Sequence, residues 1–341
     1  MRTLVVSDLH LGALRRNDVL LNPEPLERLL AALDDIDRLV LLGDIIDLAE
    51  GRLQHAMRVS ARVLGAVGGR LGSARQVIVV PGNHDRQLVD RWIRRQGVGL
   101  TPSAGVPLDA SPALAQVGSW LAPARVSAHY PGVWLSDRVW ATHGHYLDRH
   151  LFPESAFGIA RGLLGRPPRD GAAPIDYERA RRPSLVRAAR CLPGPLIALL
   201  DDMAEVARAA TMPRVPRRLL HPRLAPMLAS VLGAQMSRAS IPALARVVHR
   251  LALDAEWVVF GHVHRLGPLA GDRPLSWQGP GGRPRIVNSG SWVYEPLLVH
   301  GATPPHPYWP GGAVVIDAGG EPRAVGLLDE LDAGALHHAH P

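Results

Sequence analysis

The sequence contains no lysine, so all 38 of its Lys and Arg residues are arginine. Together with 34 glycines and 31 prolines, this composition is typical of a GC-rich genome. The net charge of +7 therefore says less about nucleic acid than the same charge on clustered lysines would, although excess arginine still favours anionic partners. We do not expect nucleic acid to be the main partner.

Cysteine is nearly absent as well, and the single Cys191 cannot form an internal disulfide or a thiolate metal site. This fits a reducing compartment, and we expect a cytoplasmic protein. No segment approaches the roughly 20 consecutive apolar residues of a membrane-spanning helix. The N-terminal stretch MRTLVVSDLHLG is too short and too polar for a signal peptide, so we expect it to form the first strand.

One pattern does recur: an apolar strand that runs into a polar tip. In α/β folds the loops that leave the C-terminal ends of strands converge and form sites. We therefore expect these polar tips to meet in space. The five segments are TLVVSDLH (3–10), RLVLLGDIID (38–47), QVIVVPGNHD (76–85), RVWATHGH (138–145) and EWVVFGHVH (256–264).

The tips carry oxygen and imidazole ligands without thiolates, which is the ligand set of a divalent transition-metal site. Seven ligands are too many for one ion and suit two ions about 3.5–4 Å apart with one shared carboxylate. Each motif alone is more often a surface loop or turn, but five at successive strand ends are far more specific. The seven candidates are Asp8, His10, Asp44, Asn83, His143, His262 and His264.

The motifs D-x-H, G-D-x-x-D, G-N-H-D, H-G-H and G-H-x-H, in this order, resemble those of the calcineurin-like metallophosphoesterases. The resemblance implies an α/β fold, a four-layer α/β/β/α sandwich of two mixed sheets. It also implies a hydrolase with two divalent metal ions. Mn²⁺ is the expected metal, and Fe, Zn or Mg are alternatives. Asp44 would bridge the ions. The other ligands would be Asp8, His10 and His264 for the first ion, and Asn83, His143 and His262 for the second.

The resemblance further implies in-line attack on phosphorus by a metal-bound hydroxide, without a covalent phosphoenzyme. Asn83 could also donate its amide hydrogens to a phosphate oxygen. His84 would protonate the leaving group, with its ring oriented by Asp47. Asp85 is an alternative partner for His84, or a cap of the following turn. His145 is a candidate phosphate contact, with plain packing as the alternative.

The domain organisation follows from the same motifs. Residues 1–150 and 254–330 are predicted to form the core, the latter with the closing strands RIVNSGSW and GAVVIDAGG, and residues 331–341 a flexible tail. Asn288, Ser289 and Gly290 are expected to form a structural turn near the site. Residues 151–253 are predicted to be a mainly helical, Arg-rich cap, because about a hundred residues far exceed an ordinary connection.

Two interpretations of the cap remain open: it handles an anionic head and an apolar tail, or its arginines form a solvated helix face over ordinary packing. Expected helices include SLVRAARCLPG and PLIALLDDMAEVARAA, with Pro-punctuated apolar sequence in LLHPRLAPMLASVLGAQM. Arginines of this range include those at positions 161, 166, 169, 179, 181, 182, 187, 190, 208, 214, 217 and 218.

The flanks DLHLG, GDIIDL, GNHD and THGHYLD resemble most closely the branch of bacterial UDP-2,3-diacylglucosamine pyrophosphohydrolases. That resemblance implies a bacterial protein, a nucleotide- or lipid-linked substrate, and peripheral contact of the cap with the inner face of the membrane. A nucleic-acid phosphodiesterase is the alternative and would need stacking aromatic residues in a basic groove. A non-catalytic scaffold is a third hypothesis, against which the full ligand set and His84 argue. The tryptophans available for stacking are Trp134, Trp140, Trp257, Trp277, Trp292 and Trp309.

Overall fold

The structure is a computed structural model that describes residues 1–13, 17–49, 53–150, 168–179, 233, 236–299 and 301–336. Most of the predicted cap, 151–253, lies outside these ranges. The helices expected in SLVRAARCLPG and PLIALLDDMAEVARAA are therefore not described, nor is most of LLHPRLAPMLASVLGAQM. Of the arginines named for the cap, the described ones are Arg169 and Arg179.

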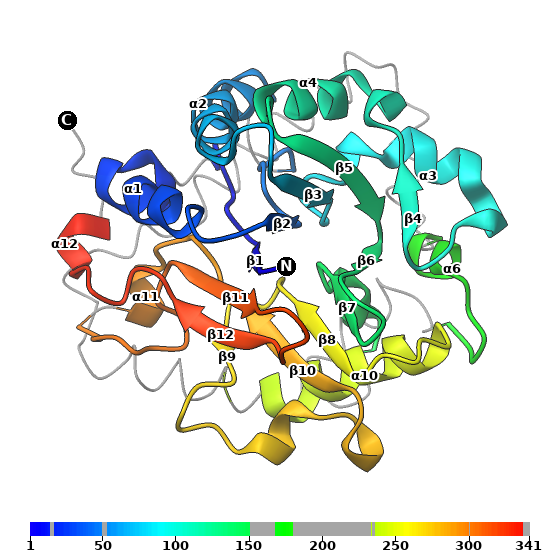
Figure 1. Ribbon diagram of the computed structural model, residues 1–341. Helices are drawn as coiled ribbons and strands as arrows, with labels where there is room; N and C mark the ends of the chain where they lie inside the picture. Colours follow the sequence, from blue (N-terminus) through cyan, green and yellow to red (C-terminus); the bar gives the residue numbers. More distant parts are fainter. Residues whose placement is uncertain are drawn as a thin grey trace, which may run out of the picture.

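Two mixed β-sheets form the centre of the molecule (Figure 1). The seven-stranded sheet has the order β12-β11-β1-β2-β3-β5-β4, and the five-stranded sheet has the order β6-β7-β8-β10-β9. The bounds in the first are β1 Thr3–Val6, β2 Arg38–Leu42, β3 Gln76–Val80, β4 Ala104–Val106, β5 Arg125–Tyr130, β11 Gly312–Ile316 and β12 Arg323–Gly326. The second contains β6 Gly132–Trp134, β7 Val139–Thr142, β8 Trp257–Phe260, β9 Leu266–Gly267 and β10 Arg285–Ser289.

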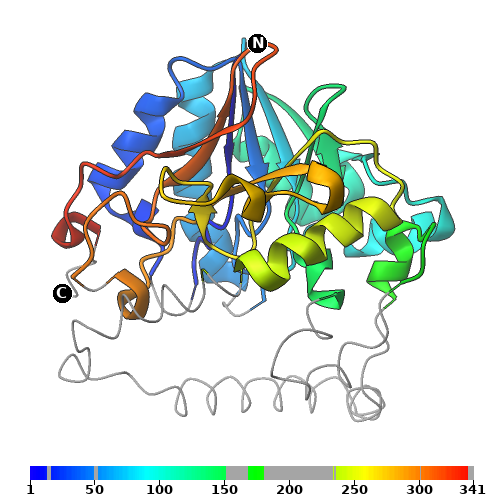
Figure 2. The same ribbon diagram turned by 90° about the horizontal axis from the view of Figure 1, so that it is seen from below.

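Helices cover the outer face of each sheet, which confirms the predicted four-layer α/β/β/α sandwich. The helices α1 (Pro23–Ala32), α2 (Leu53–Leu71) and α4 (Pro112–Trp120) lie over the seven-stranded sheet. On the other side α10 (Ile241–Arg250) lies over the five-stranded sheet and stands in front in Figure 2. In the described ranges no helix combines the length and the apolar character needed to cross a bilayer.

The central strands read as continuous apolar runs because both of their faces are buried. In β2, Leu39 and Leu41 point into the core under the helices, whereas Val40 and Leu42 point into the core between the two sheets. All four side chains are almost fully buried. The alternation fixes which residues of the strand face each core, since a shift of one residue would exchange the two faces.

The helix α10 lies within the range predicted as cap, yet it packs on the core. Its residues Leu244, Val247 and Val248 are buried against Val258 and Phe260 of β8. The core therefore begins before residue 254, at the start of this amphipathic helix. Within the predicted tail the structure describes α12 (Ala333–Leu336), whose Leu336 is buried in the core under the helices.

Candidate active site

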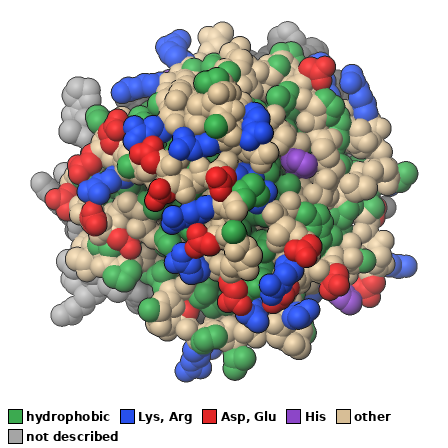
Figure 3. All heavy atoms as spheres, viewed as in Figure 1, with side chains coloured by type: hydrophobic (Ala, Val, Ile, Leu, Met, Phe, Trp, Pro, Cys, Tyr) green, Lys and Arg blue, Asp and Glu red, His purple; other side chains and the backbone are tan. Residues whose placement is uncertain are grey.

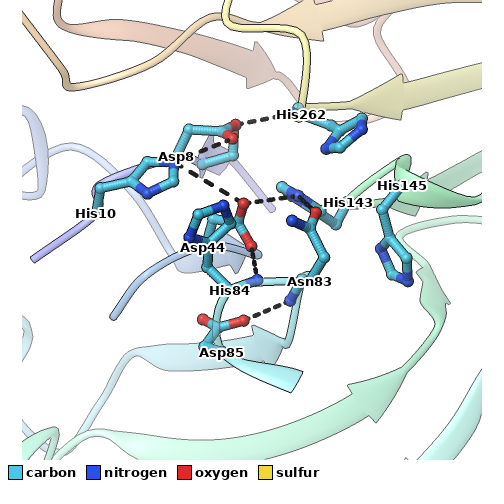
Figure 4. A network of polar contacts seen from close by, with 12 residues as sticks. Asp8, His10, Asp44, Asn83, His84, Asp85, His143, His145 and His262 are labelled. Atoms are coloured by element: carbon cyan, nitrogen blue, oxygen red, sulfur yellow. Dashed lines mark hydrogen bonds and ion pairs between the residues drawn. The ribbon is translucent and has the colours of Figure 1, made fainter. Parts of the chain in front are cut away.

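The predicted polar tips meet at one edge of the molecule. β1, β2 and β3 run parallel in one sheet, and β7 and β8 run parallel in the other. The loops that leave the C-terminal ends of these strands converge (Figure 4). They bring together Asp8 and His10 after β1, Asp44 and Asp47 after β2, Asn83 and His84 after β3, His143 after β7, and His262 and His264 after β8.

The backbone at these positions is unusual. Five candidate ligands have positive φ angles, a conformation that costs a non-glycine residue free energy and that concentrates at functional sites. Among the described residues one further non-glycine residue, Ala252, shares it. This feature was not foreseen from the sequence. The five angles are 54° at Asp8, 45° at His10, 50° at Asp44, 69° at His262 and 56° at His264.

The first ligand group consists of Asp8, His10 and His264. The Nε2 atom of His264 lies 3.2 Å from Oδ1 of Asp8 and 3.3 Å from Nε2 of His10. Oδ1 of Asp8 is buried and has no hydrogen-bond partner within the described ranges, whereas Oδ2 accepts hydrogen bonds from Ser7 Oγ and from the backbone N–H of His262. Although burial raises it, the pKa of Asp8 is lowered to about 2 by His264 and His143.

The second group is centred on His143. Its Nδ1 lies 3.1 Å from the carbonyl oxygen of Leu42, to which it can donate a proton. Its Nε2 lies 3.2 Å from Oδ2 of Asp44 and 3.1 Å from Oδ1 of Asn83. Two acceptor oxygens thus converge on one ring nitrogen, which requires a proton or a cation between them. Burial lowers the pKa of His143, but Asp44 and Asp8 raise it to about 10.

His262 completes the second group, and a residue outside the motifs orients it. Its Nε2 lies 3.0 Å from Oδ1 of Asp148, which leaves Nδ1 as the nitrogen suited to bind a metal. One ligand atom each from Asp44, His143 and His262 lies within 4.8 Å of the other two, and the same holds for the group of Asp8, His10 and His264. The oxygen and imidazole nitrogen ligands, with buried carboxylates among them, fit divalent cations.

Asp47 lies between two histidines of the site. Its Oδ1 is 3.2 Å from Nδ1 of His84, and its Oδ2 is 3.5 Å from Nδ1 of His10. Asp85, the alternative partner of His84, instead accepts hydrogen bonds from the backbone N–H groups of Gly82 (2.6 Å) and Ile45 (2.8 Å). It therefore ties the loop after β3 to the loop after β2, and it makes no side-chain cap on the turn that follows.

Three glycines of the motifs allow the loops to approach one another closely. A Cβ atom on Gly43 would lie 2.4 Å from the ring of His143, and one on Gly82 would lie 2.3 Å from Oδ1 of Asp44. One on Gly261 would lie 2.3 Å from Oγ of Ser7. Real Cβ atoms do not come this close to other heavy atoms, so each glycine is required by packing against the ligands.

Two further predicted features lie around the ligands. The ring of His145 is 5.6 Å from that of His143, and its Nε2 is 3.3 Å from the hydroxyl of Tyr130. Burial and the neighbouring His143 hold the pKa of His145 well below its usual value. Asn288 and Ser289, expected in a turn, are instead the last two residues of β10, and the amide nitrogen of Asn288 donates to the carbonyl oxygen of Gly261 (2.6 Å), next to His262. The end of β10 thus supports the loop that carries the last two histidines.

Sequence reasoning missed three side chains that contact or support the ligands: Ser7, Asp148 and Tyr130. Ser7 stands inside the segment 3–10 and Asp148 in the flank THGHYLD, but neither spacing nor residue type distinguishes them from ordinary loop residues. Tyr130 is the last residue of β5, a strand that carries no motif. Only the hydrogen bonds between distant segments reveal these three.

Residues 1–169 match the sequence model of a family described as calcineurin-like phosphoesterase. The matched range is just under half of the 341 residues and contains the loops after β1, β2, β3 and β7, whereas the segment of His262 and His264 lies beyond it. No curated protein matches the chain.

Among solved structures, the chain is similar to the cold-active protein-tyrosine phosphatase of a psychrophilic Shewanella species. The identity is 14% and the TM-score 0.33, with 95% of this chain and 80% of that chain covered. A second structure of a cold-active protein tyrosine phosphatase matches at 13% identity and a TM-score of 0.33, with coverage of 95% and 78%. Similarities this low carry no argument about fold or activity.

The two sheets, their helices and the converging loops define the fold as that of a metallophosphoesterase. The family match over residues 1–169 supports the calcineurin-like phosphoesterase superfamily and indicates a phosphoester hydrolase.

The close approach at Gly82 generates a prediction. We expect Gly82→Ala to displace Asp44 and His143 and so to weaken binding of divalent metal by at least about 10-fold, the range of losses seen for perturbed metal surroundings. Gly65→Ala is the control, because Gly65 lies in α2 with open space around it and should gain about 0.5–1 kcal/mol of stability. Calorimetric titration with Mn²⁺ measures the first effect and thermal unfolding the second. Equal affinity in both variants would contradict the packing argument.

Proposed function

We propose that the chain hydrolyses a phosphoester or pyrophosphate bond with two divalent cations. The observation that carries this proposal is the position of Asp44. Its Oδ2 lies 3.2 Å from Nε2 of His143 in the second ligand group and 3.8 Å from Nε2 of His10 in the first. A single carboxylate within reach of both groups is what a bridged pair of ions requires.

The assignment of ligands follows from this proposal. The first ion would be held by Asp8, His10 and His264, and the second by Asn83, His143 and His262, with Asp44 shared. Bound cations of this kind polarise phosphoryl oxygens and increase the acidity of a water. Mn²⁺ is our proposed metal because the ligands are oxygens and imidazoles, with no thiolate among them.

His84 and Asn83 are the proposed groups that act directly on the substrate. Asp47 accepts at Nδ1 of His84 and would stabilise the imidazolium, so Nε2 would deliver the proton to the departing oxygen. The backbone N–H of His84 donates to Oδ1 of Asp44 (2.8 Å), which fixes the acid relative to the ligands. Asn83 has an exposed side chain, and its amide hydrogens could bind a phosphate oxygen. His145 remains a proposed contact to the same phosphate.

The proposed substrate is an anionic phosphate compound, nucleotide- or lipid-linked. Its support is the Arg-rich and apolar composition of the range 151–232 and the motif flanks that resemble the UDP-2,3-diacylglucosamine pyrophosphohydrolases. On this proposal the protein acts in the cytoplasm and contacts the inner face of the membrane through that range.

The observations on the described residues do not favour a nucleic-acid phosphodiesterase. Four of the tryptophans considered for base stacking are buried in the cores: Trp140, Trp277, Trp292 and Trp309. The face shown in Figure 3, on the side of the molecule away from the proposed ligands, carries acidic and basic side chains side by side.

The bridging role of Asp44 predicts that its substitution weakens the binding of both metal ions together. We expect Asp44→Asn to lose most of its activity on an aryl phosphoester and to bind both metal equivalents more weakly, because the shared negative charge is gone. Elemental analysis after dialysis and a rate assay with added Mn²⁺ measure the two effects. Asp109→Asn, at an exposed position, is the control and should behave like the parent. A variant with two equivalents of metal and full turnover would refute the shared ligand.

The acid role of His84 predicts a dependence on the leaving group. We expect His84→Ala to keep its metals but to turn over alkyl phosphoesters about 10²–10⁴-fold more slowly, because these leaving groups need a proton. Esters of acidic phenols should lose much less, since their oxyanions depart unprotonated. The control is His249→Ala, which removes an exposed histidine of α10. Equal losses on both kinds of ester would argue against proton transfer by His84.

The substrate proposal predicts that the range 180–232 serves recognition rather than chemistry. Replacing it by a Gly/Ser linker retains α6 (Pro174–Glu178), α10 and every proposed ligand. We expect hydrolysis of a small aryl phosphoester to persist, while kcat/KM for a lipid-linked nucleotide pyrophosphate falls at least about 100-fold through lost positioning. Circular dichroism and metal content check the folded state. If the replaced protein handled both substrates like the parent, the range would have no part in recognition.

A further inference from the structure

Glu178 is a buried carboxylate at the end of α6, outside the range that matches the phosphoesterase family. Its side chain is 6% exposed. One oxygen, Oε1, accepts hydrogen bonds from the hydroxyls of Tyr130 and Tyr146, the latter at 2.6 Å. The other, Oε2, accepts from Arg86 at 2.7 Å (Nη2) and 2.9 Å (Nε). Four donor contacts saturate this carboxylate, which offsets the cost of burying its charge.

The three partners of Glu178 come from three different loops at the site. Arg86 stands two residues after His84, in the loop that follows β3. Tyr130 ends β5, and Tyr146 follows directly on His145 in the loop after β7. Glu178, at the end of α6, thus connects the loop after β3, which carries the proposed acid His84, to the loop after β7, which carries His143 of the second ligand group.

The hydrogen bonds also determine the state of His145. Tyr130 has one hydroxyl proton, which it donates to Glu178, so its oxygen can only accept from Nε2 of His145. Burial and the charge of Glu178 hold the pKa of both tyrosine hydroxyls well above the usual value, so this proton stays on the tyrosine. His145 therefore carries its proton on Nε2. Its Nδ1 is buried and has no hydrogen-bond partner within the described ranges.

We propose that Glu178 is a positioning residue of the active site, which fixes the tautomer and orientation of His145 through Tyr130 and holds the loop of His84 through Arg86. The effect on hydrolysis rests on the proposed function, whereas the tautomer of His145 does not. Through Glu178 the inserted range takes part in shaping the site, in addition to any role in substrate recognition.

The first test is the protonation of the ring of His145, measured by ¹⁵N NMR on the full-length protein with labelled histidine and bound Zn²⁺. The signals are assigned by comparison with His145→Gln. In the parent we expect a protonated Nε2 and an unprotonated Nδ1. Tyr130→Phe removes the hydroxyl but leaves the pair of Glu178 and Arg86. In this variant the proton should move from Nε2 to Nδ1 of His145, or the two tautomers should interconvert and give averaged ¹⁵N shifts. Glu178→Gln should change the ¹⁵N shifts in the same direction.

The second test is kinetic. Glu178→Gln should lower kcat on an aryl phosphoester by about 10- to 100-fold, the usual cost of losing a residue that orients the groups around a metal. The matched control is Glu256→Gln, which removes a carboxylate paired with Arg138 at the opposite end of β8 and should leave kcat unchanged.

The outcomes are separable. An unchanged ¹⁵N pattern in Tyr130→Phe, or a changed pattern without any loss of kcat in Glu178→Gln, overturns the positioning role. If Glu178→Gln does not fold, Tyr130→Phe alone decides through the same two measurements. Absence of hydrolysis in the parent would refute the proposed function, and the NMR result would still decide whether Glu178 sets the state of His145.

Discussion

The contact between Asp44 and His143 joins the two sheets at the site, and the rest of the arrangement depends on it. Asp44 belongs to the loop after β2 in the seven-stranded sheet, and His143 belongs to the loop after β7 in the five-stranded sheet. A second link of this kind runs from the backbone N–H of His262 to Asp8. Because each sheet supplies part of both ligand groups, the site exists only when the sheets are packed at their observed spacing.

The unusual backbone at the ligands is maintained by hydrogen bonds that continue the sheet beyond its regular strands. The N–H of Asp8 donates to the carbonyl of Gly43, and that of His10 donates to the carbonyl of Asp44. The carbonyl of Asp8 in turn accepts from the N–H of Trp292, whose side chain is fully buried. These bonds stabilise the left-handed conformations at the candidate ligands.

Much of the fold could be predicted because β1, β2, β3, β7 and β8 are buried on both faces and end in polar motifs. β5 escaped prediction because its sequence, RVSAHY, alternates and includes exposed residues, and β9 has only two residues. α10 was assigned to the cap because it lies in the long segment between two motifs, although one of its faces is buried in the core. The residues that meet in the site were predicted from the motifs, but Asp148 and Glu178 were not, because no local pattern encodes a hydrogen bond between distant segments.

The glycines that precede three of the candidate ligands, Gly43, Gly82 and Gly261, change what the sequence motifs mean. Each is required because a side chain would collide with an atom of a neighbouring loop, and none supplies a ligand atom. The glycines of the motifs are therefore explained by the close packing of the loops rather than by the catalytic chemistry. At Gly82 this constraint does not depend on the ligand side chain alone, because a Cβ atom there would also lie 2.7 Å from the backbone nitrogen of Asp44, whichever side chain stood at position 44.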